Sequence, residues 1–181
     1  MNLAGSQIDP ATFAAMTAVV AHRGPDDCGI EHFSGTPTIS LGHRRLSIID
    51  LSPTGHQPMA SVDGSMRIVL NGEIYNYQDI RQELKDRDWQ FRTSSDTEVL
   101  LSAYQVCGKS CLEKLNGMFA FAIWDERKKV LFAARDRLGI KPLYYWQSGD
   151  TLILASEIKS ILASGMVPAE PDWEAISTPW H

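Results

Sequence analysis

The sequence has no long hydrophobic run, no block of like charge and no even set of cysteines. Its longest apolar runs, such as residues 118–124, fall far short of the ~20 residues that cross a bilayer, so we predict no membrane span. The net charge of -5 comes from interspersed acids and bases, which argues against a nucleic-acid surface. The odd set of Cys28, Cys107 and Cys111, with no signal-peptide pattern, indicates a reducing, cytoplasmic setting.

Length and composition favour one globular domain. A chain of 181 residues, 44% apolar and 22% charged, buries enough surface to fold without disulfides or metals. We place the domain at residues 1–167. The tail at residues 168–181 contains three prolines and has the composition of a linker.

Capping and turn signals divide the domain into helices and strands. A helix is expected from Pro10 to near Ala21. Asn71 and Gly72 predict a hairpin turn, with Tyr75 on the returning side. The mostly apolar C-terminal strands predict sheets packed on both faces, in a layered α+β domain. Strands are expected at residues 38–44, 66–70, 118–125, 130–135, 143–147 and 151–156, with further helices after a capping box at residues 95–98 and over residues 157–164.

Polar residues gather at the ends of three predicted elements, where binding sites are commonly built. They are Arg45, the run Asn71, Gly72 and Glu73, and Asp96 in the first turn of a helix. A guanidinium that grips an α-carboxylate, together with carboxylates that receive an α-ammonium, suits a free amino acid. The Asn71 amide and the Gly72 N–H offer two donors to one oxygen, as an oxyanion hole does in amide cleavage.

Each of these residues also has a plainer interpretation. Asn71 and Gly72 are commonly only a hairpin turn, and an isolated Arg45 is commonly a surface ion pair. Asp96 complements the dipole of its helix, and Glu73 is explained as a solvent-facing strand residue. The pattern alone leaves both interpretations open.

Six segments resemble the class II glutamine amidotransferase domain of asparagine synthetases in order and approximate spacing. They are HRGPD at residues 22–26, RLSIID at 45–50, NGEIYN at 71–76, SDTE at 95–98, GMFAFAIWD at 117–125 and RDRLGIKPLYY at 135–145. The resemblance covers residues 8–165. HRGP and NGEIYN favour the asparagine-synthetase branch over amidophosphoribosyl or hexosamine relatives.

The resemblance implies an N-terminal-nucleophile hydrolase fold, which is a four-layer αββα sandwich. It implies that Asn71 and Gly72 form the oxyanion hole for an L-glutamine substrate, and that the domain itself holds no cofactor or metal. The implied substrate-binding residues are Arg45 for the α-carboxylate, Glu73 and Asp96 for the α-ammonium, and Ile48 and Ile49 through their main chain.

The other matching segments are expected to be structural. His22 is expected to form structural hydrogen bonds, and the run of residues 135–137 to form an ion-paired turn. Cys107 and Cys111 have no accompanying histidines and are expected to be structural thiols, not metal ligands.

The sequence departs from the family at its beginning. In the family a strand begins with a cysteine, whose thiolate attacks glutamine and whose α-amine acts as the base. Here the sequence begins Met1, Asn2, Leu3, without that strand or cysteine. Cys28 does not substitute, because an internal cysteine has no free α-amine. We expect an upstream start to supply the strand. The alternatives are a glutamine-binding scaffold without a nucleophile, or a fragment without function.

A second departure lies at the other end. Asparagine synthetases continue into an ATP-pyrophosphatase domain with a Ser-Gly-Gly-x-Asp-Ser loop, which this sequence lacks. We therefore expect ATP and Mg²⁺ to bind only in such a synthetase domain or subunit, which would receive the ammonia. Residues 168–181 are then a linker or the start of that domain. The acceptor of the ammonia is left open, since one fold serves many functions.

Overall fold

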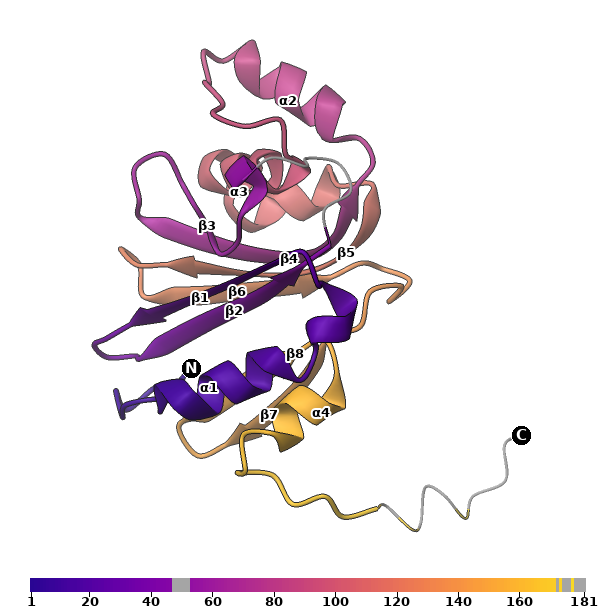
Figure 1. Cartoon of the computed structure of the whole chain (residues 1–181). Coiled ribbons are helices and arrows are strands. Elements are labelled where there is room, and N and C mark those ends of the chain that lie inside the picture. The colour runs from indigo at the N-terminus through magenta and orange to yellow at the C-terminus, as the bar shows by residue number, and fades with distance from the viewer. Residues whose placement is uncertain (47–52, 172, 174–176, 178–181) are drawn as a thin grey trace.

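The computed structural model describes residues 1–46, 53–171, 173 and 177. Within these residues the chain forms a helical layer, two antiparallel β-layers and a second helical layer, stacked as in Figure 1. The α+β class and the αββα arrangement expected from the sequence are confirmed.

Helices α1 (Pro10–Ala18) and α4 (Ile158–Leu162) form the first layer and contact each other. The carboxylate of Asp9 caps α1 by accepting hydrogen bonds from two N–H groups of its first turn, and the proline ring fixes the next φ. The predicted start is thus confirmed, but the helix ends earlier than predicted, and a 3₁₀ turn, η1 (Ala21–Arg23), follows. Glycine at position 42 lets α1 approach the sheet, because a Cβ there would lie 2.4 Å from Thr17 Oγ1.

The outer β-layer consists of two antiparallel hairpins joined by the chain's first residues. The hairpins are β1 (Asp27–Phe33) with β2 (Ile39–Arg45), and β7 (Tyr144–Ser148) with β8 (Thr151–Ala155). Asn2 bridges Thr38, just before β2, and Thr151, the first residue of β8. Its N–H donates to the Thr38 carbonyl at 2.8 Å, and the Thr38 N–H donates back at 2.9 Å. Among the described residues this pairing links the two hairpins at one end only.

The inner β-layer has the order β3 (Met59–Ala60), β4 (Met66–Ile74), β5 (Gly117–Asp125), β6 (Val130–Arg135), all antiparallel. β5 is a central strand and is buried from Phe119 to Asp125, so both of its faces are packed, as predicted. Between the two β-layers, Trp124 packs with Ile39 and Leu41 of β2. This small cluster holds the outer layer over the inner one.

The fourth layer holds α2 (Tyr77–Lys85), α3 (Asp96–Cys107) and a 3₁₀ turn, η3 (Gly108–Glu113). The Ser95 side chain caps α3 and Gly108 ends it with a φ of 59°, as the sequence predicts. Apolar side chains of α3 pack against β4 of the inner sheet, and those of α2 pack against α3. Together with the sheet they form the largest core of the domain. That core fixes the first turn of α3 beside β4.

The predicted hairpin turn at Asn71 and Gly72 is wrong. β4 runs through both residues to Ile74 and stays paired with β5 along its whole length. A Cβ on Gly72 would lie 2.1 Å from the Met118 carbonyl oxygen, so this glycine allows two strands to approach closely and does not reverse the chain. Tyr75 therefore follows the same strand and is not on a returning one.

Three smaller predictions also fail. Glu98 does not close a capping box, because its carboxylate accepts hydrogen bonds from the Arg92 and Thr93 N–H groups. Asp136 does not form an ion-paired turn, because it accepts backbone N–H bonds at both oxygens while Arg135 donates to backbone carbonyls. β7 is largely exposed and is not packed on both faces. The sequence patterns also did not predict α2, β1 or β3.

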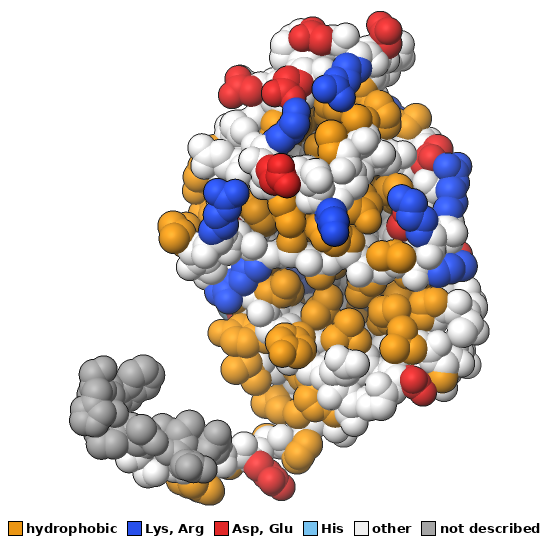
Figure 2. Space-filling view, turned by 180° about the vertical axis from the view of Figure 1, so that it is seen from behind, with side chains coloured by type: hydrophobic (Ala, Val, Ile, Leu, Met, Phe, Trp, Pro, Cys, Tyr) orange, Lys and Arg blue, Asp and Glu red, His pale blue; other side chains and the backbone are white. Residues whose placement is uncertain are grey.

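On one face of the molecule the side chains differ between the two halves. Figure 2 shows charged side chains over the half with α2 and α3, and many apolar side chains over the half with β7, β8 and α4. No helix within the described ranges is long and apolar enough to cross a membrane. Most of residues 168–181 lie outside the described residues, so the domain boundary at residue 167 and the linker stay predictions.

Candidate active site

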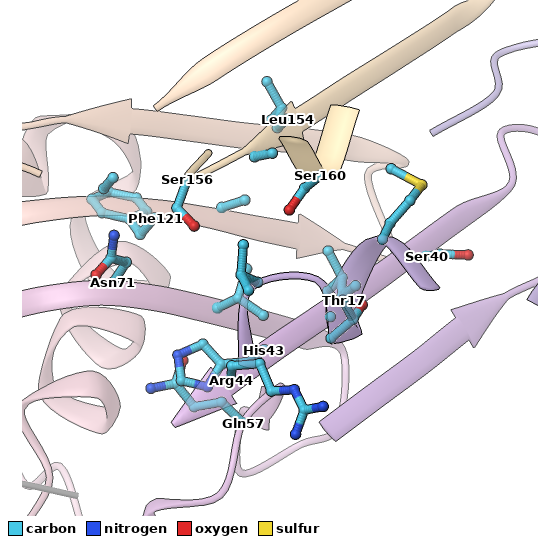
Figure 3. Close-up of a pocket in the computed structure, with 18 of the residues that line it drawn as sticks. Thr17, Ser40, His43, Arg44, Gln57, Asn71, Phe121, Leu154, Ser156 and Ser160 are labelled. Carbon is cyan, nitrogen blue, oxygen red and sulfur yellow. The ribbon is translucent and has the colours of Figure 1, made fainter. Parts of the chain in front are cut away.

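One cavity of about 780 Å³ opens between the two β-layers and reaches the helices of the first layer. Figure 3 shows its lining side chains arriving from α1, β2, β4, β5, β8 and α4. This volume lies within the range of typical small-molecule pockets. Five of the seven predicted site residues line it: Arg45, Asn71, Gly72, Glu73 and Asp96. The other two, Ile48 and Ile49, lie outside the described residues.

Asn71 lies on β4 with its amide in the cavity wall (Figure 3). Its Nδ2 is buried and has no hydrogen-bond partner among the described residues. A buried donor without a partner costs about 1–3 kcal/mol, which folded proteins rarely accept without a reason. Gly72, next to it, is exposed and presents backbone to the same cavity. The pair thus offers donors to a ligand oxygen, as an oxyanion hole requires.

Arg45 ends β2, and its side chain is only 9% exposed. Its guanidinium lies against Gly55, where an added Cβ would come 2.1 Å from Nη2. Gly55 ends a 3₁₀ turn, η2 (Pro53–Gly55), that leads toward β3. A buried guanidinium in a cavity wall suits a carboxylate ligand, because its planar fork donates two parallel hydrogen bonds.

Glu73 and Asp96 supply negative charge at another part of the cavity wall. Asp96 opens α3, is 6% exposed, and its Oδ2 accepts a hydrogen bond from the Ile74 N–H at 3.0 Å. Burial raises the pKa of the Asp96 carboxyl above its ordinary value, and the nearby charge of Glu73 adds to the rise. A ligand ammonium would relieve this repulsion, so two carboxylates here favour a cation.

Two cavity residues were not found from the sequence. Gln57 is 7% exposed, and its side-chain amide bonds both the Leu70 N–H and the Thr97 hydroxyl. His43 bonds the Leu70 carbonyl through Nε2 at 3.0 Å, and burial lowers its pKa to about 4. Neither residue stands in a pattern that marks a site. Only the fold brings them together.

His22 is placed as predicted. Its Nε2 lies 2.9 Å from Glu157 Oε1, and Arg23 Nη1 approaches the same oxygen at 3.2 Å. These contacts tie the loop after α1 to the residue before α4. His22 is not among the described residues that line the cavity, in keeping with a structural role.

A family described as the glutamine amidotransferase domain matches residues 2–180. The chain belongs to this family. Asparagine synthetase [glutamine-hydrolyzing] 3 of Bacillus subtilis is 44% identical over 168 residues, which is 92% of this chain and 27% of that protein. Amidase chry2 of Gibberella zeae is 46% identical over 155 residues, 86% of this chain and 22% of that protein. These matches make it a class II glutamine amidotransferase domain of the asparagine-synthetase type.

The fold of this glutamine amidotransferase domain is also found in a solved structure. Glutamine phosphoribosylpyrophosphate amidotransferase from B. subtilis superimposes with a TM-score of 0.74 at 24% identity, over 89% of this chain and 42% of that one. At that identity the match shows the fold alone. The domain spans about a quarter of the two curated relatives named above.

Proposed function

We propose that this domain binds L-glutamine in the cavity between β2, β4 and α3, and hydrolyses it to glutamate and ammonia when a strand beginning with cysteine precedes Asn2. The observation that carries the proposal is the cavity itself. Its lining includes the buried guanidinium of Arg45, the carboxylates of Glu73 and Asp96, and the orphaned amide donor of Asn71, which together complement the groups of glutamine.

The roles follow from the chemistry of each group. The Arg45 fork binds the α-carboxylate, and Glu73 with Asp96 binds the α-ammonium. Asn71 Nδ2 and the Gly72 N–H donate to the carboxamide oxygen, whose charge grows when a nucleophile attacks. Loss of one such donor typically costs about 10²–10³ in rate. The main chain of Ile48 and Ile49 is proposed to complete the pocket.

The strand pairing at the chain's beginning supports a place for the nucleophile. Asn2 pairs with Thr38 and Thr151, so an extended segment before Asn2 would continue antiparallel between β2 and β8. We call the space between β2 and β8, beyond Asn2, the slot. Thr38 and Leu152 bond the first residues of the chain through their backbone N–H and C=O groups. Because these groups point the same way at every second residue of a strand, those of Gly42 and Leu154 face the slot. The slot is part of the same cavity.

The register of that pairing supports a position for one added residue beside the proposed glutamine pocket. Arg45 lies seven residues after Thr38, so its antiparallel partner lies seven residues before Asn2. In the extension Met-Cys-Gly-Ile-Ala-Gly-Ile-Val, joined directly to Asn2 and with its methionine removed, that partner is the cysteine. Opposed residues share a face with Cβ atoms about 5 Å apart. The cysteine would thus point to the same side as Arg45, toward β4.

The reaction is then a two-step acyl transfer. The thiolate sulfur attacks the carboxamide carbon, and the α-amine of the same cysteine takes the thiol proton and passes it to the leaving nitrogen. Ammonia departs and a thioester remains. Water cleaves the thioester to release glutamate and restore the thiol, so glutamine and water yield glutamate and ammonia. The three free thiols, Cys28, Cys107 and Cys111, favour a reducing, cytoplasmic setting for this chemistry.

A second function is favoured by one observation. None of the described residues that line the cavity is a cysteine, and Cys28, which is exposed on β1, is not among them. The sequence as printed is therefore suited to bind glutamine without cleaving it. In both cases we propose that any ammonia acceptor is a synthetase domain or subunit, and that ATP and Mg²⁺ bind there and not here.

Ammonia release separates the two functions. It is measured with glutamine for three proteins: the 181-residue chain, the chain carrying the extension Met-Cys-Gly-Ile-Ala-Gly-Ile-Val before Asn2, and that extension with its cysteine changed to alanine. The glutaminase proposal expects activity only in the second protein. Binding of glutamine by all three without ammonia release from any supports the scaffold function. Titration with ATP is expected to give no heat, and a micromolar affinity would contradict the proposal.

A further inference from the structure

Gln57 lies between η2 and β3 and is buried, although it belongs to no helix or strand. Both ends of its side-chain amide are engaged. Oε1 accepts a hydrogen bond from the Leu70 N–H at 2.7 Å, and Nε2 donates to Thr97 Oγ1 at 3.3 Å. A glutamine amide has a donor end and an acceptor end on one rigid plane, so it can join two separate elements.

The two partners of Gln57 are the immediate neighbours of site residues. Leu70 precedes Asn71 on β4, and Thr97 follows Asp96 in the first turn of α3. One buried side chain therefore connects the strand that carries the proposed oxyanion hole to the helix turn that carries a proposed ammonium ligand.

The Gln57 side chain also makes a hydrogen bond to β4 that a neighbouring strand would otherwise make. β3 pairs with β4 only at residues 67 and 68, so beyond that point the outer edge of β4 has no strand partner among the described residues. There the Leu70 N–H donates a hydrogen bond to Gln57 Oε1, and the Leu70 carbonyl accepts one from His43 Nε2 at 3.0 Å. Further along β4, the Ile74 N–H donates to Asp96 Oδ2 at 3.0 Å. The end of β4 is thus positioned from this side by the side chains of Gln57, His43 and Asp96, and not by a β-ladder.

We propose that Gln57 is a positioning residue that sets the spacing between Asn71–Gly72 and Asp96, so that one glutamine molecule reaches both. This rests on the proposed binding of glutamine in the cavity. Gln57 need not touch the ligand. Gln57 affects the affinity only of a ligand that contacts both Asn71–Gly72 and Asp96. A ligand that contacts one of these two ends tolerates a change in the distance between them.

Three ligands test this distinction. Glutamine carries both the carboxamide and the ammonium. 2-Aminopentanoate lacks the carboxamide, and 5-amino-5-oxopentanoate lacks the ammonium. Gln57→Met keeps the length of the side chain and removes both of its hydrogen bonds. Thr97→Val removes only the hydrogen bond to α3. Dissociation constants are measured by NMR titration of the 181-residue chain.

The expected result for Gln57→Met is a dissociation constant for glutamine raised by about tenfold, the worth of one or two neutral hydrogen bonds. The two one-ended ligands are expected to change by less than about threefold. Thr97→Val is expected to reproduce part of the glutamine effect and to add little in the double variant, since the two residues share one bond. An equal loss for all three ligands, or no loss for any, would overturn the proposal.

Two further measurements keep failures apart. Ser102 lies on α3 away from its first turn, and its hydroxyl accepts a partly buried hydrogen bond from the Trp89 indole. Ser102→Ala removes that bond and is expected to leave all three affinities unchanged. Hydrogen exchange of the Leu70 amide reports directly on its hydrogen bond to Gln57. Unchanged protection of this amide in Gln57→Met, measured without ligand, would overturn the proposal. If the parent chain binds none of the three ligands, the proposed function has failed and the positioning role fails with it.

Discussion

Substitution of Gly55 by alanine is expected to weaken glutamine binding while hardly changing stability. The new Cβ would lie 2.1 Å from Arg45 Nη2 and 2.7 Å from Cζ, so the guanidinium must move. Because the displaced group is the end of a flexible side chain, we expect the unfolding free energy to change by less than about 1 kcal/mol. The Arg45 fork to a carboxylate is worth about 1.5–3 kcal/mol, so the dissociation constant should rise about 10- to 150-fold.

Calorimetric titration with glutamine and urea denaturation of the same samples measure the two effects. Arg45→Ala serves as the reference for complete loss of the fork. Gly64→Ala is the opposite control, since Gly64 lies in open space at a φ of 70° and its substitution should cost stability but no affinity. Unchanged affinity in Gly55→Ala, with a clear loss in Arg45→Ala, would refute the reasoning about the guanidinium.

Three further predictions follow from single residues. Gly72→Ala places a Cβ 2.1 Å from the Met118 carbonyl oxygen and should lower the unfolding free energy by about 1–3 kcal/mol. A urea midpoint equal to that of the parent chain would argue against the close approach of β4 and β5 at this residue. Burial lowers the pKa of His43 from 6.5 in the unfolded chain to about 4 in the folded one. The unfolding free energy should therefore fall by about 3 kcal/mol as the pH drops from 6.5 to 4. Urea titrations of His43→Asn should show a loss of this pH dependence. The pKa of the Asp96 carboxyl is raised, so affinity for glutamine should decline with falling pH at a higher pH than an ordinary aspartate would give. Asp96→Asn should bind more weakly and lose this pH dependence in NMR titrations.

The sequence predicts elements well where one local signal decides them. Ser95 and Gly108 bound α3 as expected, and the apolar run of β5 is buried as expected. The turn at Asn71 and Gly72 was mispredicted because a local turn preference competes with nine residue pairs between β4 and β5, and the ladder wins. That competition involves residues far apart in the chain, which no local pattern contains.

The site divides in the same way. Five residues of the predicted glutamine site do line one cavity, since their segments match a family pattern and end at neighbouring elements. Gln57 and His43 could not be found, because each acts on the backbone of Leu70, and neither contact follows from spacing or composition. Residues that bind a ligand carry a recognisable chemistry. Residues that hold a strand in place show it only in the fold.

The shared cavity has a thermodynamic consequence for the proposed strand. The slot between β2 and β8 and the pocket of Arg45, Asn71 and Asp96 are parts of one cavity, so a strand in the slot would form a wall of the proposed glutamine pocket. Two ligands that share a wall affect each other's affinity by the same factor in both directions. Glutamine should therefore raise the melting temperature of the chain with the alanine-substituted extension more than that of the 181-residue chain, when both are titrated to equal concentration. Equal shifts would mean that the strand does not border the pocket, and the register inferred from Asn2 would be wrong.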